Sequence, residues 1–210
     1  MRHLIITVTV VISTTSAAFG GDFTTSDVMT HPSQGDVSVV EGVDSHFVAT
    51  PDGVFVHFES GSLKPGNTHA MWFVTIANPS ACATSPCFGK DVLKNTDAVI
   101  ADANYAGGAA ADDTGIASFA TNQEVGAQKK GWLGHGFSGA STSEIHLVIK
   151  DHGPLIDSRA SEMLGTFRDG CTDASFSKAF FSVAVTDGAT GPNTCTMVQF
   201  SVFTTPQQQS

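Results

Sequence analysis

The sequence predicts an all-β protein: an antiparallel β-sandwich, immunoglobulin-like or jelly-roll-like, with one or two short helices. Three observations predict it. Short segments alternate between apolar and polar side chains, and clusters rich in Gly, Pro, Asn and Asp separate these segments. The chain also holds 15 Phe against one Tyr and two Trp, which indicates a core built on Phe, because disordered chains are poor in aromatic residues.

Six segments show the alternation of a strand with one buried face. They are residues 54–59, 69–77, 116–121, 144–150, 180–186 and 194–204. The segment 144–150 is the clearest of them. Its residues Ile145, Leu147 and Ile149 fall on one face, and Glu144, His146 and Lys150 fall on the other.

Two further segments, 92–103 and 158–167, are each predicted to hold a short helix. The sandwich is expected to present loops around residues 60–68, 104–115 and 126–142.

The N-terminus has the organisation of a secretory signal peptide. Arg2 and His3 precede the apolar run 4–12, and small residues follow it as far as Gly21. The apolar run is too short for a membrane-spanning helix, which needs about 20 residues. We therefore expect a signal peptide over residues 1–20 and a secreted or periplasmic protein that keeps no membrane anchor after signal removal.

The rest of the chain is predicted to form one domain. Residues 21–205 are assigned to a single secreted β-sandwich, and residues 206–210 to a polar tail. Such a length suits one domain with a sizeable core.

The four cysteines all lie after the signal segment, as Cys82 and Cys87 and as Cys171 and Cys195. Four cysteines allow three pairings, and the sequence does not choose among them. Proximity favours Cys82 with Cys87 and Cys171 with Cys195, in keeping with an oxidising compartment. A zinc site is the rival interpretation, but neither pair has the usual CxxC spacing.

The charge balance excludes one class of partner. The chain carries 20 acidic and 10 basic residues, a net charge of −10, and its only adjacent basic pair is Lys129 and Lys130. Binding to nucleic acid needs clustered Lys and Arg, so no nucleic-acid partner is expected. The expected partner is an unknown molecule outside the cell or in the cell envelope.

The histidines supply the strongest candidates for chemistry. His146 and His152 are an even number of residues apart, so a continuous strand would place both on one face. His69 would supply a third imidazole and Glu144 a carboxylate, a set that suits copper or zinc. The alternative is that these histidines are ordinary surface residues or bond loop carbonyls, because the chain has no compact HxH or HExxH motif.

Several sequence segments together resemble a family of uncharacterised exported bacterial proteins. They are Gly66-Asn67-Thr68-His69-Ala70-Met71-Trp72-Phe73-Val74, Asn78-Pro79-Ser80-Ala81-Cys82, and the run from Glu144 to Pro154, with Cys87 and Cys171. The resemblance covers roughly residues 35–203. It implies a β domain with a disulfide, and it carries no activity over to this chain.

Three functions remain, in order of preference. The first is a secreted, non-catalytic binding or structural module of unknown ligand, which exposed aromatic residues gathered on one face would support. The second is a copper- or zinc-binding exported protein that uses the histidines named above. The third is a secreted hydrolase with paired carboxylates facing each other across a cleft. The sequence assigns no catalytic residue.

Overall fold

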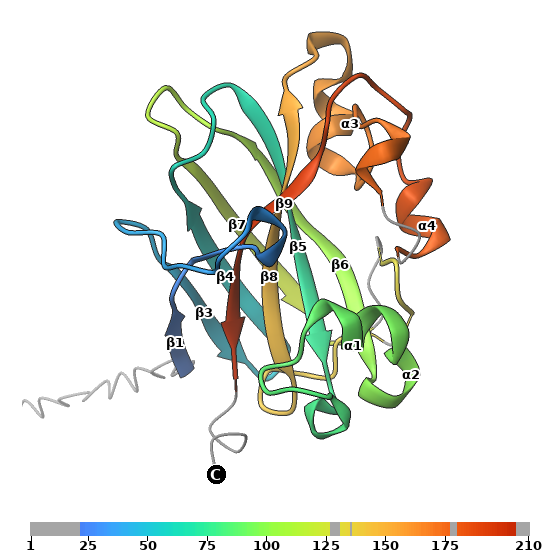
Figure 1. Ribbon diagram of the computed structural model, residues 1–210. Helices are drawn as coiled ribbons and strands as arrows, with labels where there is room; N and C mark the ends of the chain where they lie inside the picture. Colours follow the sequence, from blue (N-terminus) through green and yellow to red (C-terminus); the bar gives the residue numbers. More distant parts are fainter. Residues whose placement is uncertain (1–21, 127–130, 135, 177–179, 205–210) are drawn as a thin grey trace, which may run out of the picture.

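Two antiparallel sheets lie face to face in the computed structural model, which describes residues 22–126, 131–134, 136–176 and 180–204 (Figure 1). One sheet has four strands in the order β1-β3-β4-β7, and the other has five in the order β2-β9-β8-β5-β6. The predicted all-β antiparallel sandwich is confirmed. The expected signal peptide and the polar tail lie outside the described residues.

The four-stranded sheet, called sheet A here, comprises β1 (Asp22–Ser26), β3 (Ser45–Thr50), β4 (Gly53–Ser60) and β7 (Ala117–Glu124). Along β4, Val54, Val56 and Phe58 are buried, whereas Phe55 is 47% exposed. This alternation of period two means that one face of sheet A packs into the core and the other faces outward.

The five-stranded sheet, called sheet B here, comprises β2 (Met29–Thr30), β5 (Asn67–Ile76), β6 (Ala101–Ala110), β8 (Glu144–Pro154) and β9 (Thr196–Phe203). Its central pair is β5 with β8, in which Trp72 lies opposite Val148 and Phe73 opposite Leu147. Both strands are buried along almost their whole length.

The core between the sheets is built on aliphatic and Phe side chains. Ile145, Leu147 and Ile149 of β8 point into it, as the sequence predicts. Three pairs of Phe rings meet edge to face: Phe47 with Phe203, Phe58 with Phe119, and Phe73 with Phe137. Such pairs add to the free energy gained from burying the rings.

A second layer covers the outer face of sheet B, and it is built from four separate segments (Figure 1). The helices α1 (Gly89–Lys94) and α2 (Thr96–Val99) pack over Ile76 and Ala101. The excursion between β8 and β9 carries α3 (Ala160–Gly165) and α4 (Ser182–Val185) and packs over Trp72. The third segment is the chain that follows β2, which includes the short 3-10 helix η1 (Pro32–Gln34). The fourth is the connection between β7 and β8, whose Trp132 packs against Trp72.

Five of the six predicted strands are present, as β4, β5, β7, β8 and β9. The helix expected in 158–167 is present as α3, and the one expected in 92–103 is present in shorter form as α1 and α2. The loop expected at 104–115 is wrong, because β6 continues to Ala110. Glycine in this segment favours a loop, but at Gly108 it has a packing reason. A Cβ there would lie 2.1 Å from the carbonyl oxygen of Leu164 in α3.

The strand expected at 180–186 is also wrong. Ser182–Val185 form the helix α4, and Ala184 is buried beside Trp72 and Phe167. The apolar run from Phe180 to Val185 fits either a strand or a short buried helix. Packing against the aromatic cluster decides for the helix, and no local signal in the sequence reveals that contact.

Both disulfides favoured by proximity are present. Cys82 is bonded to Cys87 in the turn before α1, and Cys171 is bonded to Cys195 just before β9. No cysteine is left free to bind a metal. Among the described residues, no helix is long and apolar enough to span a membrane.

The two faces of β4 provide a direct test of the core. We expect Phe58→Ala to lower the free energy of unfolding by about 3–5 kcal/mol, because it leaves a cavity between the sheets. Phe55→Ala on the same strand should cost less than about 1 kcal/mol, because that ring is half exposed. Urea titration of the two variants beside the wild type measures both values. Equal losses would contradict the assignment of the two faces.

Candidate functional site

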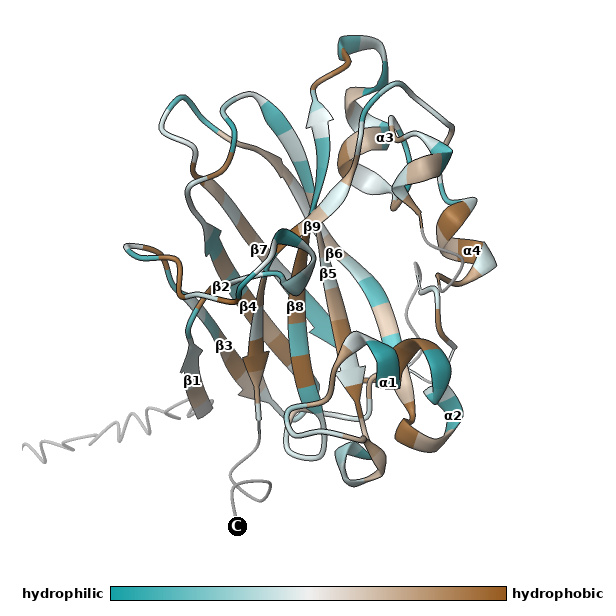
Figure 2. Ribbon diagram, in the orientation of Figure 1, coloured by the Kyte–Doolittle hydropathy of each residue, from teal (hydrophilic) through white to brown (hydrophobic). Residues whose placement is uncertain are grey.

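A row of side chains along β8 faces away from the core and is nevertheless largely buried. Glu144, His146, Lys150 and His152 are buried and Val148 is partly buried, and these residues alternate with the core residues along the strand. Hydrophilic and hydrophobic bands follow one another along the ribbon of β8 (Figure 2). The sequence predicts this alternation correctly, but the histidines are not surface residues. His146 is 8% exposed and His152 is fully buried, because the second layer covers this face.

At one end of the row, Glu144 and His146 form a hydrogen-bonded pair. Glu144 Oε1 lies 2.6 Å from His146 Nε2 and also accepts a hydrogen bond of 2.8 Å from the backbone N–H of Cys87. The Cys82–Cys87 disulfide holds the turn that supplies this N–H. The Glu144 carboxylate therefore fixes the orientation of the His146 imidazole.

His146 opens into a pocket of about 590 Å³ on the outer face of sheet B. The floor comes from β5, β6, β8 and β9, through Trp72, Val74, Ala103, His146, Val148, Met197, Phe200 and Val202. The walls come from the covering segments, and the residues there include Met29, His31, Pro32, Val37, Pro86, Phe88, Lys90, Leu93, Trp132, Phe180 and Phe181.

The pocket is mainly apolar and aromatic. Among the lining residues that the structure describes, three carry ionisable side chains: His31, Lys90 and His146. Burial lowers the pKa of His31 to about 4, so this imidazole is neutral at pH 7. A cavity of this size with few polar groups has the character of a small-molecule site.

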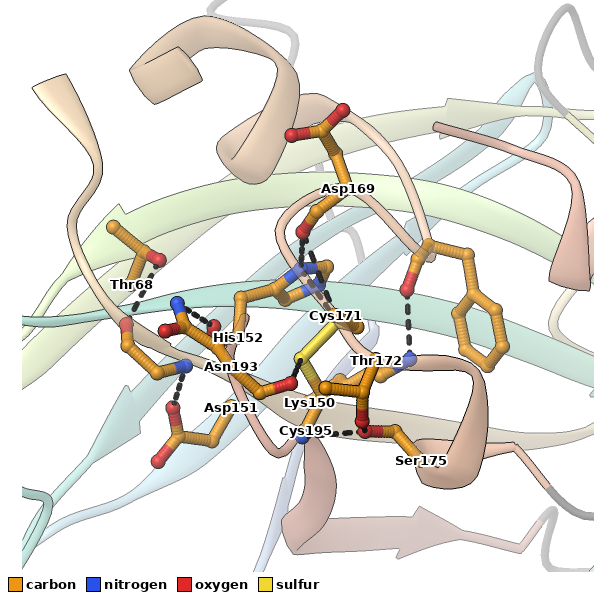
Figure 3. Close-up of a disulfide and its surroundings, with 12 residues drawn as sticks. Thr68, Lys150, Asp151, His152, Asp169, Cys171, Thr172, Ser175, Asn193 and Cys195 are labelled. Atoms are coloured by element: carbon orange, nitrogen blue, oxygen red, sulfur yellow. Dashed lines mark hydrogen bonds between the residues drawn. A yellow bond between two sulfur atoms is a disulfide. The ribbon is translucent and has the colours of Figure 1, made fainter. Parts of the chain in front are cut away.

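Lys150 follows Val148 in the row and is buried. Its Nζ donates a hydrogen bond of 2.7 Å to the carbonyl oxygen of Phe167 and lies 3.8 Å and 4.0 Å from the ring centres of Phe167 and Phe176 (Figure 3). Burial lowers the pKa of Lys150 to about 6. The amine anchors the excursion that carries α3 and α4 to the sheet.

The far end of the row is tied to the second disulfide. His152 Nδ1 lies 2.9 Å from the carbonyl oxygen of Asp169, and the Cys171–Cys195 bond packs beside the ring (Figure 3). Burial, reinforced by the charge of Lys150, lowers the pKa of His152 to about 4. His69 lies on β5, with Nε2 3.8 Å from a carboxylate oxygen of Asp151, and burial lowers its pKa as well.

The structure divides the four residues proposed as metal ligands into two groups. Glu144 and His146 lie together at the pocket, and His69 and His152 lie toward the other end of β8. His152 is six positions beyond His146 along the strand, a distance of about 20 Å. One ion therefore cannot bind both of them.

Another set of potential ligand atoms near His152 consists of this imidazole with Cys171 and Cys195. Both cysteines are held in a disulfide, so they offer no thiolate to a metal.

The sequence patterns described above do not predict the pocket. The signal for it is the apolar character of the outward positions Trp72 and Val74 on β5 and Val148 on β8, where a solvent-exposed face would be polar.

Comparisons with protein-family models, with curated proteins and with solved structures found no match.

Buried neutral imidazoles make stability depend on pH. An unfolded histidine takes up a proton near pH 6.5, whereas folded His152 takes one up only near pH 4. The unfolded state therefore binds more protons in this window, and stability falls as the pH falls through it. His152 alone should cost about 2–3 kcal/mol between pH 7 and pH 4.5.

The measurement is urea unfolding of the wild type and of His152→Gln at these two pH values. The variant should lose less stability on acidification by about that amount, whatever its stability at pH 7. If wild type and variant lose the same free energy, the buried neutral state of His152 is contradicted.

Proposed function

We propose that this protein is an exported, non-catalytic binding protein that takes an apolar small molecule into the pocket on the outer face of sheet B. The observation that carries the proposal is the pocket of about 590 Å³ with its aromatic lining. Sites for small molecules are typically apolar cavities of about 300–1,000 Å³ with a few polar groups.

The aromatic residues of the pocket suit a flat or chain-like apolar ligand. Trp72 and Trp132 lie against each other on one side, and Phe180 and Phe181 lie at the edge of the same cluster. Aromatic side chains contribute large contact areas at a low cost in conformational entropy. Burying an apolar ligand against them supplies the main free energy of binding.

His146 is proposed to recognise one polar group of that ligand. It is the ionisable residue on the floor of the pocket, and Glu144 fixes its ring. An oriented hydrogen-bonding group in a mainly apolar cavity gives a bound ligand a defined orientation. This arrangement favours a ligand with one polar end and an apolar body.

Export is part of the proposal. The N-terminal segment has the pattern of a signal peptide, and two disulfides staple the domain. The ligand is therefore expected to come from outside the cytoplasm.

Binding is tested with an environment-sensitive apolar dye, 1-anilinonaphthalene-8-sulfonate, and with medium-chain fatty acids as competitors. We expect the wild type to bind one dye per chain and the competitors to displace it. Val148→Phe places extra volume on the pocket floor and should weaken dye binding by at least about tenfold.

Val125→Phe is the matched control, because it makes the same change at an exposed site outside this pocket, and it should bind like the wild type. Dye binding that is equal in both variants would place the dye elsewhere and contradict the proposal.

A further inference from the structure

Two histidines face each other on the outer surface of sheet A, on the opposite side of the molecule from the pocket floor. His46 of β3 is the cross-strand partner of His57 of β4, and the centres of their rings are 4.9 Å apart. Asp44 precedes β3 and places Oδ2 3.5 Å from His46 Nδ1. One potential ligand atom from each of these three residues lies within 4.8 Å of the other two.

Both imidazoles are oriented and still have a nitrogen available. His57 Nε2 lies 3.2 Å from Ser118 Oγ on β7, and the Phe23 ring packs against His46 at 5.1 Å. The Nδ1 atoms of both histidines are buried and have no hydrogen-bond partner among the described residues. When His57 donates from Nε2 to the serine, its Nδ1 presents a lone pair, which is how a neighbouring group prepares a histidine to bind metal.

A second carboxylate lies beside this group. The backbone N–H of Glu59 donates a hydrogen bond of 2.9 Å to the carbonyl oxygen of Asp44, so the two residues are opposite each other on neighbouring strands. Glu59 is two positions from His57 and points to the same face of the sheet. A change of rotamer would bring its carboxylate to the histidines.

We propose that Asp44, His46 and His57 form a surface zinc site, with Glu59 or water as the fourth ligand. Two imidazoles and a carboxylate match the nitrogen and oxygen ligands of tetrahedral Zn²⁺, which binds them at about 2.0–2.2 Å. Closing the present spacing to these bond lengths needs side-chain rotation only, because the three residues already lie on one face of paired strands. Asp44 is exposed and both histidines are half-buried, so the site lies at the surface of sheet A.

This site is independent of the proposed ligand pocket. It lies on the other sheet and shares no residue with the pocket. The two proposals are therefore tested separately, and failure of one leaves the other unaffected.

The experiment is a calorimetric titration of the tag-free, disulfide-bonded protein with zinc chloride at pH 7.5. We expect one zinc per chain with a micromolar Kd, and loss of that binding in both His46→Gln and His57→Gln. Ser118→Ala should weaken binding by about tenfold, because it removes the group that orients His57. His146→Gln is the control on the other sheet and should bind zinc like the wild type.

Cobalt provides a second measurement of the same site. Co²⁺ bound by these ligands in tetrahedral geometry should give intense visible absorption that zinc displaces, and His57→Gln should not show it. The proposal is overturned if the wild type takes up no zinc at a millimolar concentration, or if the His46→Gln, His57→Gln double variant binds zinc as the wild type does. Far-ultraviolet circular dichroism confirms that each variant is folded before titration.

Discussion

The pairing of β5 with β8, at the centre of a sheet buried on both faces, is the constraint on which the rest of this structure depends. One face of the pair packs against sheet A through Phe73, Leu147 and Ile149. The other face must also be removed from water, because it carries Trp72, Val74 and Val148. The protein meets this need with a second layer drawn from four distant parts of the chain.

The second layer packs closely against some parts of sheet B and leaves a pocket over another part. Where it fits the sheet closely, polar side chains of β8 find protein partners, as Lys150 does at the carbonyl of Phe167. Where these segments do not meet, an apolar pocket remains over the sheet. The same layer therefore explains why the imidazoles at one end of β8 are structural and why the one at the other end, His146, faces a cavity.

The sandwich itself was predictable from local patterns, because alternation along a strand is a property of nearby residues. The faces of β8, the helix α3 and the two disulfides follow from such patterns and from proximity. The covering of sheet B was not predictable in this way. It depends on contacts between residues far apart in the chain, such as that of Gly108 with Leu164. The packing of Ala184 against the aromatic cluster is another such contact, and it favours α4 where a strand was expected.

The candidate sites follow the same division. The sequence identifies His146 and Glu144 as neighbours, since they lie two positions apart on one strand, and the structure brings them into contact. It does not identify His46 with His57, because their meeting depends on the register between β3 and β4. The aromatic walls of the pocket are equally invisible to a local pattern, since Trp132 and Phe180 belong to irregular segments.

The pocket is complete only when the last strand is in place, because its lining residues come from segments far apart in the chain. Residues near the N-terminus form one wall, and β9, the last strand, provides part of the floor through Met197, Phe200 and Val202. A chain that emerges from a ribosome or a secretion channel lacks a complete pocket until this final strand pairs with β8. If the chain crosses a membrane unfolded, it crosses empty, so any cargo is acquired at its destination and none is carried out from the cell.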